Sequence, residues 1–420
     1  MYMNLDIAIL NVVPYLTVFL MSLRSQKELT LFSIIIFAYL MTAIFGCILI
    51  NSNISVYPNL SIFNFIYLFI CVLIFVWPFR YAKFTATNIT IIENRWINLL
   101  LIVYFISGVI VAFYGVPRTI ATAQIDDWAQ VRNQVYTDAD SIEYYSSTFE
   151  KLAKNVYTYL TPFGIVMIFY QFSKKDFNAI ATIALLAIWG INTYCDSTVM
   201  ASRGMVVFSA LNLALAFIMF RKAISAKRKK IIYIIAIGFA IFFYTYVSAV
   251  SEARFKDDSN DMALWYLGQS MNVFNQDIMT PMHDFAYGKY FFKWFIELFG
   301  GNSDINFNAL GSTHGVQFMT FIGCFFVDFG PLGTIIVGLI MCRLLMNFTR
   351  KSHYYLSDLI VIAYYANWYI NGVMVVGRGQ SLPWAMLFIV YFIVRNMETR
   401  KLRKHTTVYL KDSHPHSKNK

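Results

Sequence analysis

The sequence predicts an all-α protein that crosses a membrane many times. Hydrophobic residues make up 58% of the 420 residues and charged residues only 14%, whereas about a quarter of the residues in an average soluble domain are charged. The apolar residues gather in repeated runs of about 20 that are continuously apolar and do not alternate with polar residues. Because only helices and closed barrels satisfy their backbone inside lipid, these runs indicate membrane-spanning helices.

Eleven runs are expected to span the membrane, and this odd number places the two termini on opposite sides. The first run begins at MYMNLDIAIL, which lacks a basic segment and a small-residue cleavage site. We therefore interpret it as a span and not as a signal peptide. The expected spans are residues 5–23, 30–50, 59–79, 96–114, 153–172, 177–195, 205–220, 231–250, 331–348, 356–376 and 382–394.

Lys and Arg decide the orientation, because cytoplasmic connections carry an excess of these residues. One alternate set of connections, together with the C-terminal tail, holds 23 of the 34 Lys and Arg residues, and the other set holds ten. We therefore expect the N-terminus outside and the C-terminus in the cytoplasm. The net charge of +11 then reflects basic residues that anchor on anionic lipid, and we expect no binding of nucleic acid.

The expected organisation is one transmembrane domain, residues 1–394, followed by a basic cytoplasmic tail, residues 395–420. Two long outer connections, residues 115–152 and 251–330, are longer than most loops that lack a function. Within the second, residues 287–301 are apolar with spaced charges and predict a helix in the membrane interface. Residues 316–329 predict a half-buried helix that breaks at Gly330-Pro331 before the next span.

Neither a metal nor another cofactor is expected. The acidic segment DDSND (Asp257, Asp258, Asp261) does not match the spacing of a calcium loop. The sequence contains no phosphate-binding loop and no G-x-S-x-G motif. The five cysteines share no close spacing, so they predict neither a disulfide framework nor a metal cluster.

Arg203, Arg254 and Arg378 lie at the outer mouths of spans, against the distribution of the other basic residues. One interpretation is that they reach the interface or pair with a local carboxylate such as Glu252 or Asp196. The other is a shared anionic ligand that bears a diphosphate, because the fork of donors on arginine suits phosphate oxygens. Glycine follows both Arg203 and Arg378 and would let a ligand approach the backbone closely.

Four residues near the outer face are candidate general bases: Glu252, Asp328, His283 and His314. A structural role for each stays open, because histidine near a loop end commonly supports the fold. Asp328 lies at a depth where an ionised carboxylate is costly unless it has a partner.

The SRG motif (Ser202–Gly204) and the DFGPLG turn (Asp328–Gly333), with the plan of spans, a large late outer loop and a basic C-terminus, resemble the Wzy-type O-antigen polymerases. These bacterial oligosaccharide repeat unit polymerases have a GT-C-like fold in the inner membrane. The resemblance implies transfer of a growing glycan from undecaprenyl diphosphate to a sugar hydroxyl of a new lipid-linked unit. It implies a periplasmic reaction, without a nucleotide sugar or a metal, that builds O-antigen or capsule.

This resemblance gives the candidate residues their expected roles. Arg203, Arg254 and Arg378 would stabilise the diphosphate leaving group, and one of the four candidate bases would accept the proton of the acceptor hydroxyl. The implied partners are the undecaprenyl-diphosphate-linked oligosaccharide, membrane lipid and a polysaccharide chain-length regulator.

Three alternatives stay open: an O-antigen ligase, a transporter or flippase of lipid-linked sugars, and a multi-pass acyltransferase of cell-surface sugars, which would need a histidine in the membrane such as His314. A transporter should carry polar residues deep in several helices. Most of the expected spans have none, apart from residues such as Asn367 and Asn371. An enzyme at one membrane face is therefore the leading interpretation.

Overall fold

A computed structural model describes residues 2–412, except for residues 91, 93, 126–127, 129–146, 256–258, 313–317 and 375. Throughout these ranges the regular structure is helical, apart from an isolated bridge between Ile89 and Tyr354. The all-α prediction is therefore confirmed. The α-helices are α1 (Tyr2–Gln26), α2 (Leu31–Asn51), α3 (Ile62–Val76), α4 (Arg95–Ala123), α6 (Thr148–Ser173), α7 (Ala179–Val199), α8 (Arg203–Phe220), α9 (Ala226–Phe255), α10 (Ser259–Val273), α11 (Lys293–Leu298), α12 (Thr320–Thr349), α13 (Leu356–Asn371) and α14 (Ser381–Asp412).

Short polar residues mark the starts of several helices. The side chains of Thr30, Asn94, Ser147 and Asn178 each accept a hydrogen bond from a backbone N–H in the first turn of α2, α4, α6 and α7, respectively. Such N-caps satisfy donors that have no partner within the helix. Each cap therefore stabilises the first turn of its helix.

Eight helical segments in the described chain are long and apolar enough to cross a membrane, so the prediction of a multi-pass membrane protein is confirmed. Some of them expose large apolar side chains, as Ile234 on α9 does with 71% of its surface accessible. Such apolar surfaces suit contact with lipid better than contact with water. The eight segments are α1 from Asn4, α2, Ile62–Tyr81, α4, α7, α8, α9 as far as Val250, and α12.

The other three expected spans coincide with α6, α13 and α14, which fall outside this set of eight. α13 has only 16 residues. α6 carries Glu150, Lys151 and Lys154 in its first two turns. α14 becomes basic from Arg395 onwards, so its apolar part is short. The total of eleven spans therefore stays a prediction.

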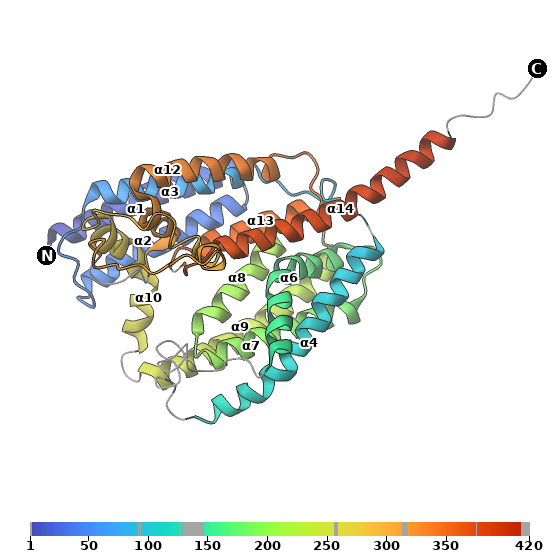
Figure 1. The fold of residues 1–420 in the computed structure, drawn as a ribbon, viewed down its shortest axis with the longest axis horizontal. Coiled ribbons are helices and arrows are strands. Elements are labelled where there is room, and N and C mark those ends of the chain that lie inside the picture. Colours follow the sequence, from blue (N-terminus) through green and yellow to red (C-terminus); the bar gives the residue numbers. More distant parts are fainter. Residues whose placement is uncertain are drawn as a thin grey trace, which may run out of the picture.

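The helices form two groups that α13 and α14 join (Figure 1). The first group contains α1, α2, α3 and α12, and the second contains α4, α6, α7, α8 and α9. α13 contacts α2 and α12 on one side and α6 and α8 on the other. α10 contacts α2 and α9, so it crosses from one group to the other. The two sides of α13 consequently have different surroundings.

One end of the bundle, which we call the basic end, gathers connections that are rich in Lys and Arg. Arg221 and Lys222 each lie 2.8 Å from a carboxylate oxygen of Glu28. Further contacts at this end join Asn88 to Tyr354, Asn94 to Met397, and Arg228 to the carbonyl groups of Phe172 and Lys175.

The other end, which we call the loop end, holds residues 52–61, 200–202, 274–312 and 376–380. Contacts there join Asn4 to Pro58, Ser61 to Asn275, and Tyr290 to Val376. The N-terminus lies at this end, whereas α14 extends beyond the basic end (Figure 1). The connections that are expected in the cytoplasm and those that are expected outside thus lie at opposite ends of the bundle.

The first nine residues of α12, Thr320–Asp328, are all buried. Their aromatic side chains pack in the first helix group, where Phe325 stacks on Phe75 with ring centroids 5.2 Å apart. α12 then breaks at Gly330, which has a φ of +67° that glycine adopts most readily. The predicted break is confirmed. The expected start of a helix at residue 331 agrees with this break, because the non-helical backbone at Gly330 separates the helical segment before it from the one that runs on to Thr349.

The helix predicted within residues 287–301 is limited to α11, Lys293–Leu298. Trp294, Leu298 and Phe299 on and after it are 47%, 74% and 84% exposed, respectively. Large apolar side chains this exposed suit the membrane interface, where Trp and other apolar groups lie among headgroups.

Candidate functional site

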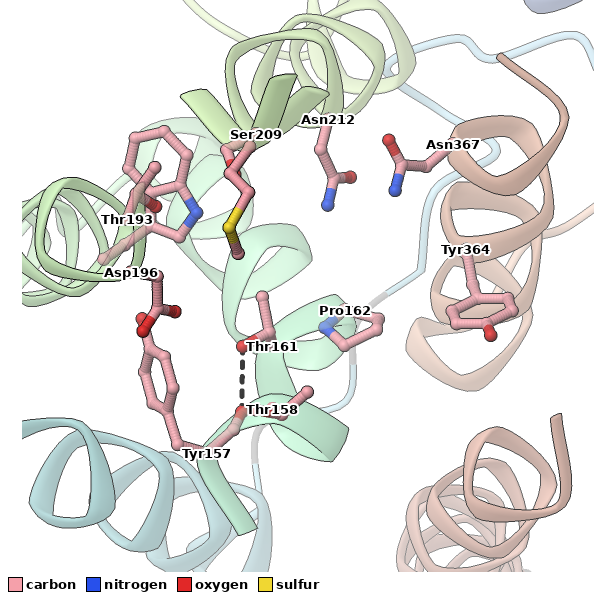
Figure 2. A pocket seen from close by; sticks show the side chains of 12 residues that line it. Tyr157, Thr158, Thr161, Pro162, Thr193, Asp196, Ser209, Asn212, Tyr364 and Asn367 are labelled. Carbon is pink, nitrogen blue, oxygen red and sulfur yellow. Dashed lines mark hydrogen bonds between the residues drawn. The ribbon is translucent and has the colours of Figure 1, made fainter. Parts of the chain in front are cut away.

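A polar cavity of about 250 Å³ lies between α6, α7, α8 and α13 (Figure 2). Aromatic side chains from Tyr157, Trp189 and Tyr364 form part of its wall. Polar residues inside a membrane-spanning bundle are costly and commonly functional, so this cavity is the leading candidate site. Its polar lining also includes Thr158, Thr161, Thr193, Asp196, Ser209, Asn212 and Asn367.

The carboxylate in the cavity wall belongs to an ion pair. Lys154 Nζ on α6 lies 2.5 Å from Asp196 Oδ1 on α7, and the side chains are 15% and 23% exposed. Partly buried charges require such pairing, because either charge alone would lose its hydration without compensation. Asp196, which the sequence suggested as a partner for an outer arginine, is paired with Lys154.

Two amide groups face each other across the cavity, those of Asn212 on α8 and Asn367 on α13 (Figure 2). The buried Oδ1 atoms of Asn367 and Asn371 have no hydrogen-bond partner among the described residues. Buried acceptors are rarely left unpaired in proteins. Tyr364, Asn367 and Asn371 follow one another at helical spacing, so this face of α13 leads from the cavity toward the loop end.

Arg203 is the first residue of α8, the helix that also supplies Ser209 and Asn212 to the cavity wall. Its guanidinium carbon lies 5.4 Å from the centroid of the Tyr266 ring on α10. The first backbone N–H groups of a helix contribute positive potential. Arg203 therefore adds a full charge to an end of α8 that already favours an anion.

Arg378 lies in the connection between α13 and α14, and its guanidinium donates a hydrogen bond to the Ser303 carbonyl oxygen. Its Nε is buried and has no partner within the described residues. Gly379 has a φ of +79°, and a Cβ there would lie 2.4 Å from the Trp294 indole. This glycine accommodates an aromatic side chain, so it no longer supports the idea of a close ligand approach.

Asp328 on α12 is completely buried. Through Tyr290 it links α12 to the segment that carries Arg378. Its two carboxylate oxygens accept hydrogen bonds from the backbone N–H groups of Tyr290 and Phe291, at 2.8 and 2.7 Å. The Tyr290 hydroxyl in turn donates to the Val376 carbonyl oxygen at 2.7 Å. The buried carboxylate of Asp328 is therefore satisfied by backbone N–H groups. This geometry suits a residue that positions residues 290–291.

The remaining predicted residues are not brought together with Asp328 and Arg378 by any described contact. Glu252 is exposed near the end of α9, and the side chain of Arg254 lies outside the described part of the chain. His283 is exposed, with its Nδ1 3.4 Å from the Pro281 carbonyl oxygen. His314 also lies outside the described residues.

The carboxyl group next to His283 is held in its ionised form. The Tyr287 hydroxyl and the Phe285 backbone N–H each donate to Asp284 Oδ1 at 2.8 Å. These hydrogen bonds, with that from Tyr287 the stronger influence, lower the pKa of Asp284.

Metal-binding geometry is not found in the described ranges: no three His, Cys, Asp or Glu side chains lie close enough there to hold an ion. Asp257 and Asp258 of the acidic segment lie outside those ranges. The five cysteines are free thiols.

Sequence reasoning missed the cavity. Most spans are expected from the sequence to be free of polar residues, yet polar side chains from four helices meet there. A signal was present in α7, where Trp189, Thr193 and Asp196 recur at intervals of four and three residues. This is the spacing of one helix face, so a search for polar residues along single faces would have found them.

The fold and the cavity define an all-helical, multi-pass membrane protein with a polar site inside its helix bundle. Comparison of the chain with known proteins found no matching family model, no similar curated protein and no similar solved structure.

Proposed function

We propose that this protein polymerises lipid-linked oligosaccharide repeat units into a surface polysaccharide such as O-antigen or capsule. It transfers the growing glycan from undecaprenyl diphosphate to an acceptor sugar hydroxyl at the periplasmic face of the bacterial inner membrane. The observation that carries the proposal is the polar cavity, one of whose helices, α8, begins with Arg203.

The lining of the cavity suits a sugar. Hydroxyl and amide groups such as those of Ser209, Asn212 and Asn367 exchange hydrogen bonds with sugar hydroxyls, and Trp189 and Tyr364 offer aromatic faces. The unpartnered Oδ1 of Asn367 is an acceptor that a sugar hydroxyl would satisfy. We assign the cavity to the acceptor sugar.

The diphosphate of the donor lies at the loop end in this proposal. Negative charge develops on it as the glycan leaves, and cationic groups placed there in advance stabilise that charge. Arg203 at the start of α8 and Arg378 after α13 are the two described arginines that we assign to this role.

The proposed orientation places the loop end in the periplasm and the basic end in the cytoplasm, with eleven spans, a large late periplasmic loop and a GT-C-like plan. The contacts of Glu28 with Arg221 and of Asn94 with Met397 at the basic end support it. They gather the connections richest in Lys and Arg, and such connections remain cytoplasmic.

Asp196 joins the four earlier candidates as a general base, because it is the carboxylate in the cavity wall. We expect Asp196→Asn to lower polymerisation by about 100-fold or more, the usual effect of losing a general base. The matched variant Lys154→Met breaks the same ion pair but keeps the carboxylate. Equal losses of polymer and of thermal stability in both variants would show that the pair only supports the fold.

The proposal predicts the glycan profile of a bacterial strain deleted for this gene. We expect surface polysaccharide on a gel to lose its long chains and to keep single repeat units on their anchor, with recovery when the wild-type gene returns. Loss of every attached unit, with long lipid-linked polymer accumulating, would instead identify an O-antigen ligase. An unchanged profile would refute the glycan assignment altogether.

A transporter or flippase of lipid-linked sugars is the second candidate, and the cavity itself favours it, because polar residues deep in several helices are typical of transport paths. The two functions separate in proteoliposomes that contain lipid-linked repeat units. A polymerase lengthens glycans without a membrane gradient, whereas a flippase moves single units across the bilayer and forms no longer product.

A further inference from the structure

Tyr266 on α10 belongs to an aromatic cluster next to the start of α8. The ring centroids of Trp265, Tyr266 and Phe318 lie 5.2 to 5.3 Å from one another, and all three pairs meet edge to face. Such pairs add to the stabilisation that burial alone provides. Two neighbouring rings, one on the same helix and one that precedes α12, therefore hold the Tyr266 ring in its orientation.

One member of this cluster has an unusual backbone. Phe318 has a φ of +64°, a conformation that bulky residues rarely adopt. Residues persist in this conformation only where the surrounding structure holds them, and they gather at functional sites. The contacts of the Phe318 ring with Trp265 and Tyr266 are part of that surrounding structure. The outlier motivates a functional assignment for the cluster.

The opposite face of α10 is anchored on α2, where the two helix backbones meet. A Cβ on Gly268 would lie 2.5 Å from the Phe45 carbonyl oxygen, and a Cβ on Gly46 would lie 3.0 Å from the Gly268 carbonyl oxygen. Residues two apart on a helix point to nearly opposite sides, so Tyr266 faces away from this contact. The helix therefore carries Tyr266 on a fixed support.

Arg203 approaches the cluster from α8. The turn before it is closed by two hydrogen bonds of 2.8 Å, from the Ser197 hydroxyl to the Ser202 carbonyl oxygen and from the Ser202 N–H to the Ser197 carbonyl oxygen. The Arg203 guanidinium carbon then lies over the Tyr266 ring, 5.4 Å from its centroid. A ring face attracts the charge of a cation and does not require a particular N–H. This contact therefore suits an arginine whose fork of donors serves phosphate oxygens.

We infer that Tyr266 is a positioning residue for Arg203 in the site that binds the diphosphate of the lipid-linked donor. The inference rests on the proposed function, in which Arg203 stabilises this diphosphate. A long arginine side chain loses conformational freedom when it binds a ligand, and a contact that orders it beforehand lowers that loss. The contact also ties α8 to a helix that packs against α2 in the first helix group.

The test measures how tightly the purified full chain in detergent binds radiolabelled undecaprenyl diphosphate, by scintillation proximity. Tyr266→Phe keeps the ring face and should bind like the wild-type protein. Tyr266→Leu removes the ring and should weaken binding about tenfold, within the range that cation–π contacts contribute. Phenylalanines with one, two and three ring fluorines at position 266 should weaken binding progressively, because fluorine withdraws negative charge from the ring face and hardly changes its size.

The matched control is Phe177→Leu, which removes a ring at the basic end that lies 5.0 Å from the guanidinium carbon of Arg228. It should bind like the wild-type protein. In an Arg203→Ala background, Tyr266→Leu should cause no further loss, whereas a ring that only supported the packing of α10 would weaken binding equally in both backgrounds. Such an equal loss, or an affinity that stays constant along the fluorinated series, would overturn the inference.

Failure of the inference is distinguishable from failure of the proposed function. If Arg203→Ala bound undecaprenyl diphosphate like the wild-type protein, the diphosphate assignment would fail, and the inference with it. If Arg203→Ala weakened binding but Tyr266→Leu did not, the inference alone would fail. If the coupling between Arg203 and Tyr266 held while the deletion strain kept its glycan profile, the polymerase proposal alone would fail.

Discussion

Arg203→Ala is expected to lower polymer formation by about 100- to 1,000-fold, the loss that follows removal of one group stabilising a developing oxyanion. The side chain lies at the start of α8, beside the ring of Tyr266, on a helix that lines the polar cavity. Arg203→Lys keeps the charge and the cation–π contact but loses the fork of donors, so it should retain part of the activity. The measurement is the length distribution of surface polysaccharide in a complemented deletion strain.

The matched control is Lys222→Ala, which removes a basic residue from the basic end. Lys222 is 44% exposed and pairs there with Glu28. Exposed ion pairs contribute little to stability, so wild-type polymer is expected from this variant. Full activity of Arg203→Ala, in protein present at normal amounts in the membrane, would contradict the assignment of Arg203 to the diphosphate.

Asp328→Ala is expected to destabilise the fold by about 3 kcal/mol, because it leaves two buried backbone N–H groups without an acceptor. Those groups belong to Tyr290 and Phe291, which the carboxylate holds at 2.8 and 2.7 Å. Loss of these bonds frees residues 288–292 and, through the Tyr290 contact with Val376, the segment that carries Arg378. The unfolding midpoint of the purified protein in detergent should fall by several degrees.

Asp328→Asn separates a positioning role from a catalytic one. Its amide keeps one acceptor oxygen, so the unfolding midpoint should lie between those of the wild-type protein and Asp328→Ala. Polymer formation should fall in proportion to that loss of stability. If Asp328→Asn instead kept the wild-type midpoint and lost all polymer, Asp328 would be the general base.

Much of the fold followed from local patterns. Continuous apolar runs located eight of the membrane-crossing helices, and residues such as Thr30 and Asn178 cap the helices that follow them. The pair Gly330-Pro331 marked the break in α12. The helix expected from residue 331 begins directly after this break, and the segment before the break is buried among aromatic side chains.

The candidate site was only partly accessible to sequence reasoning. Arg203 and Arg378 stood out because they depart from the charge pattern, and the structure places Arg378 near Asp328 through Tyr290. Asn212 and Asn367, in contrast, are 155 positions apart in the chain and meet at one cavity. No local pattern connects them, because their meeting depends on how α8 and α13 are rotated and packed.

The sequence by itself therefore determined the class of protein: an all-helical chain that crosses a membrane repeatedly, with its basic connections collected at one end. Hydrophobicity and helix capping act over short stretches and are readable without a fold. The tertiary structure alone decided the polar cavity, the backbone partners of Asp328 and the contact of Arg203 with Tyr266. Each of these depends on which helix faces meet, and packing between distant segments sets that arrangement.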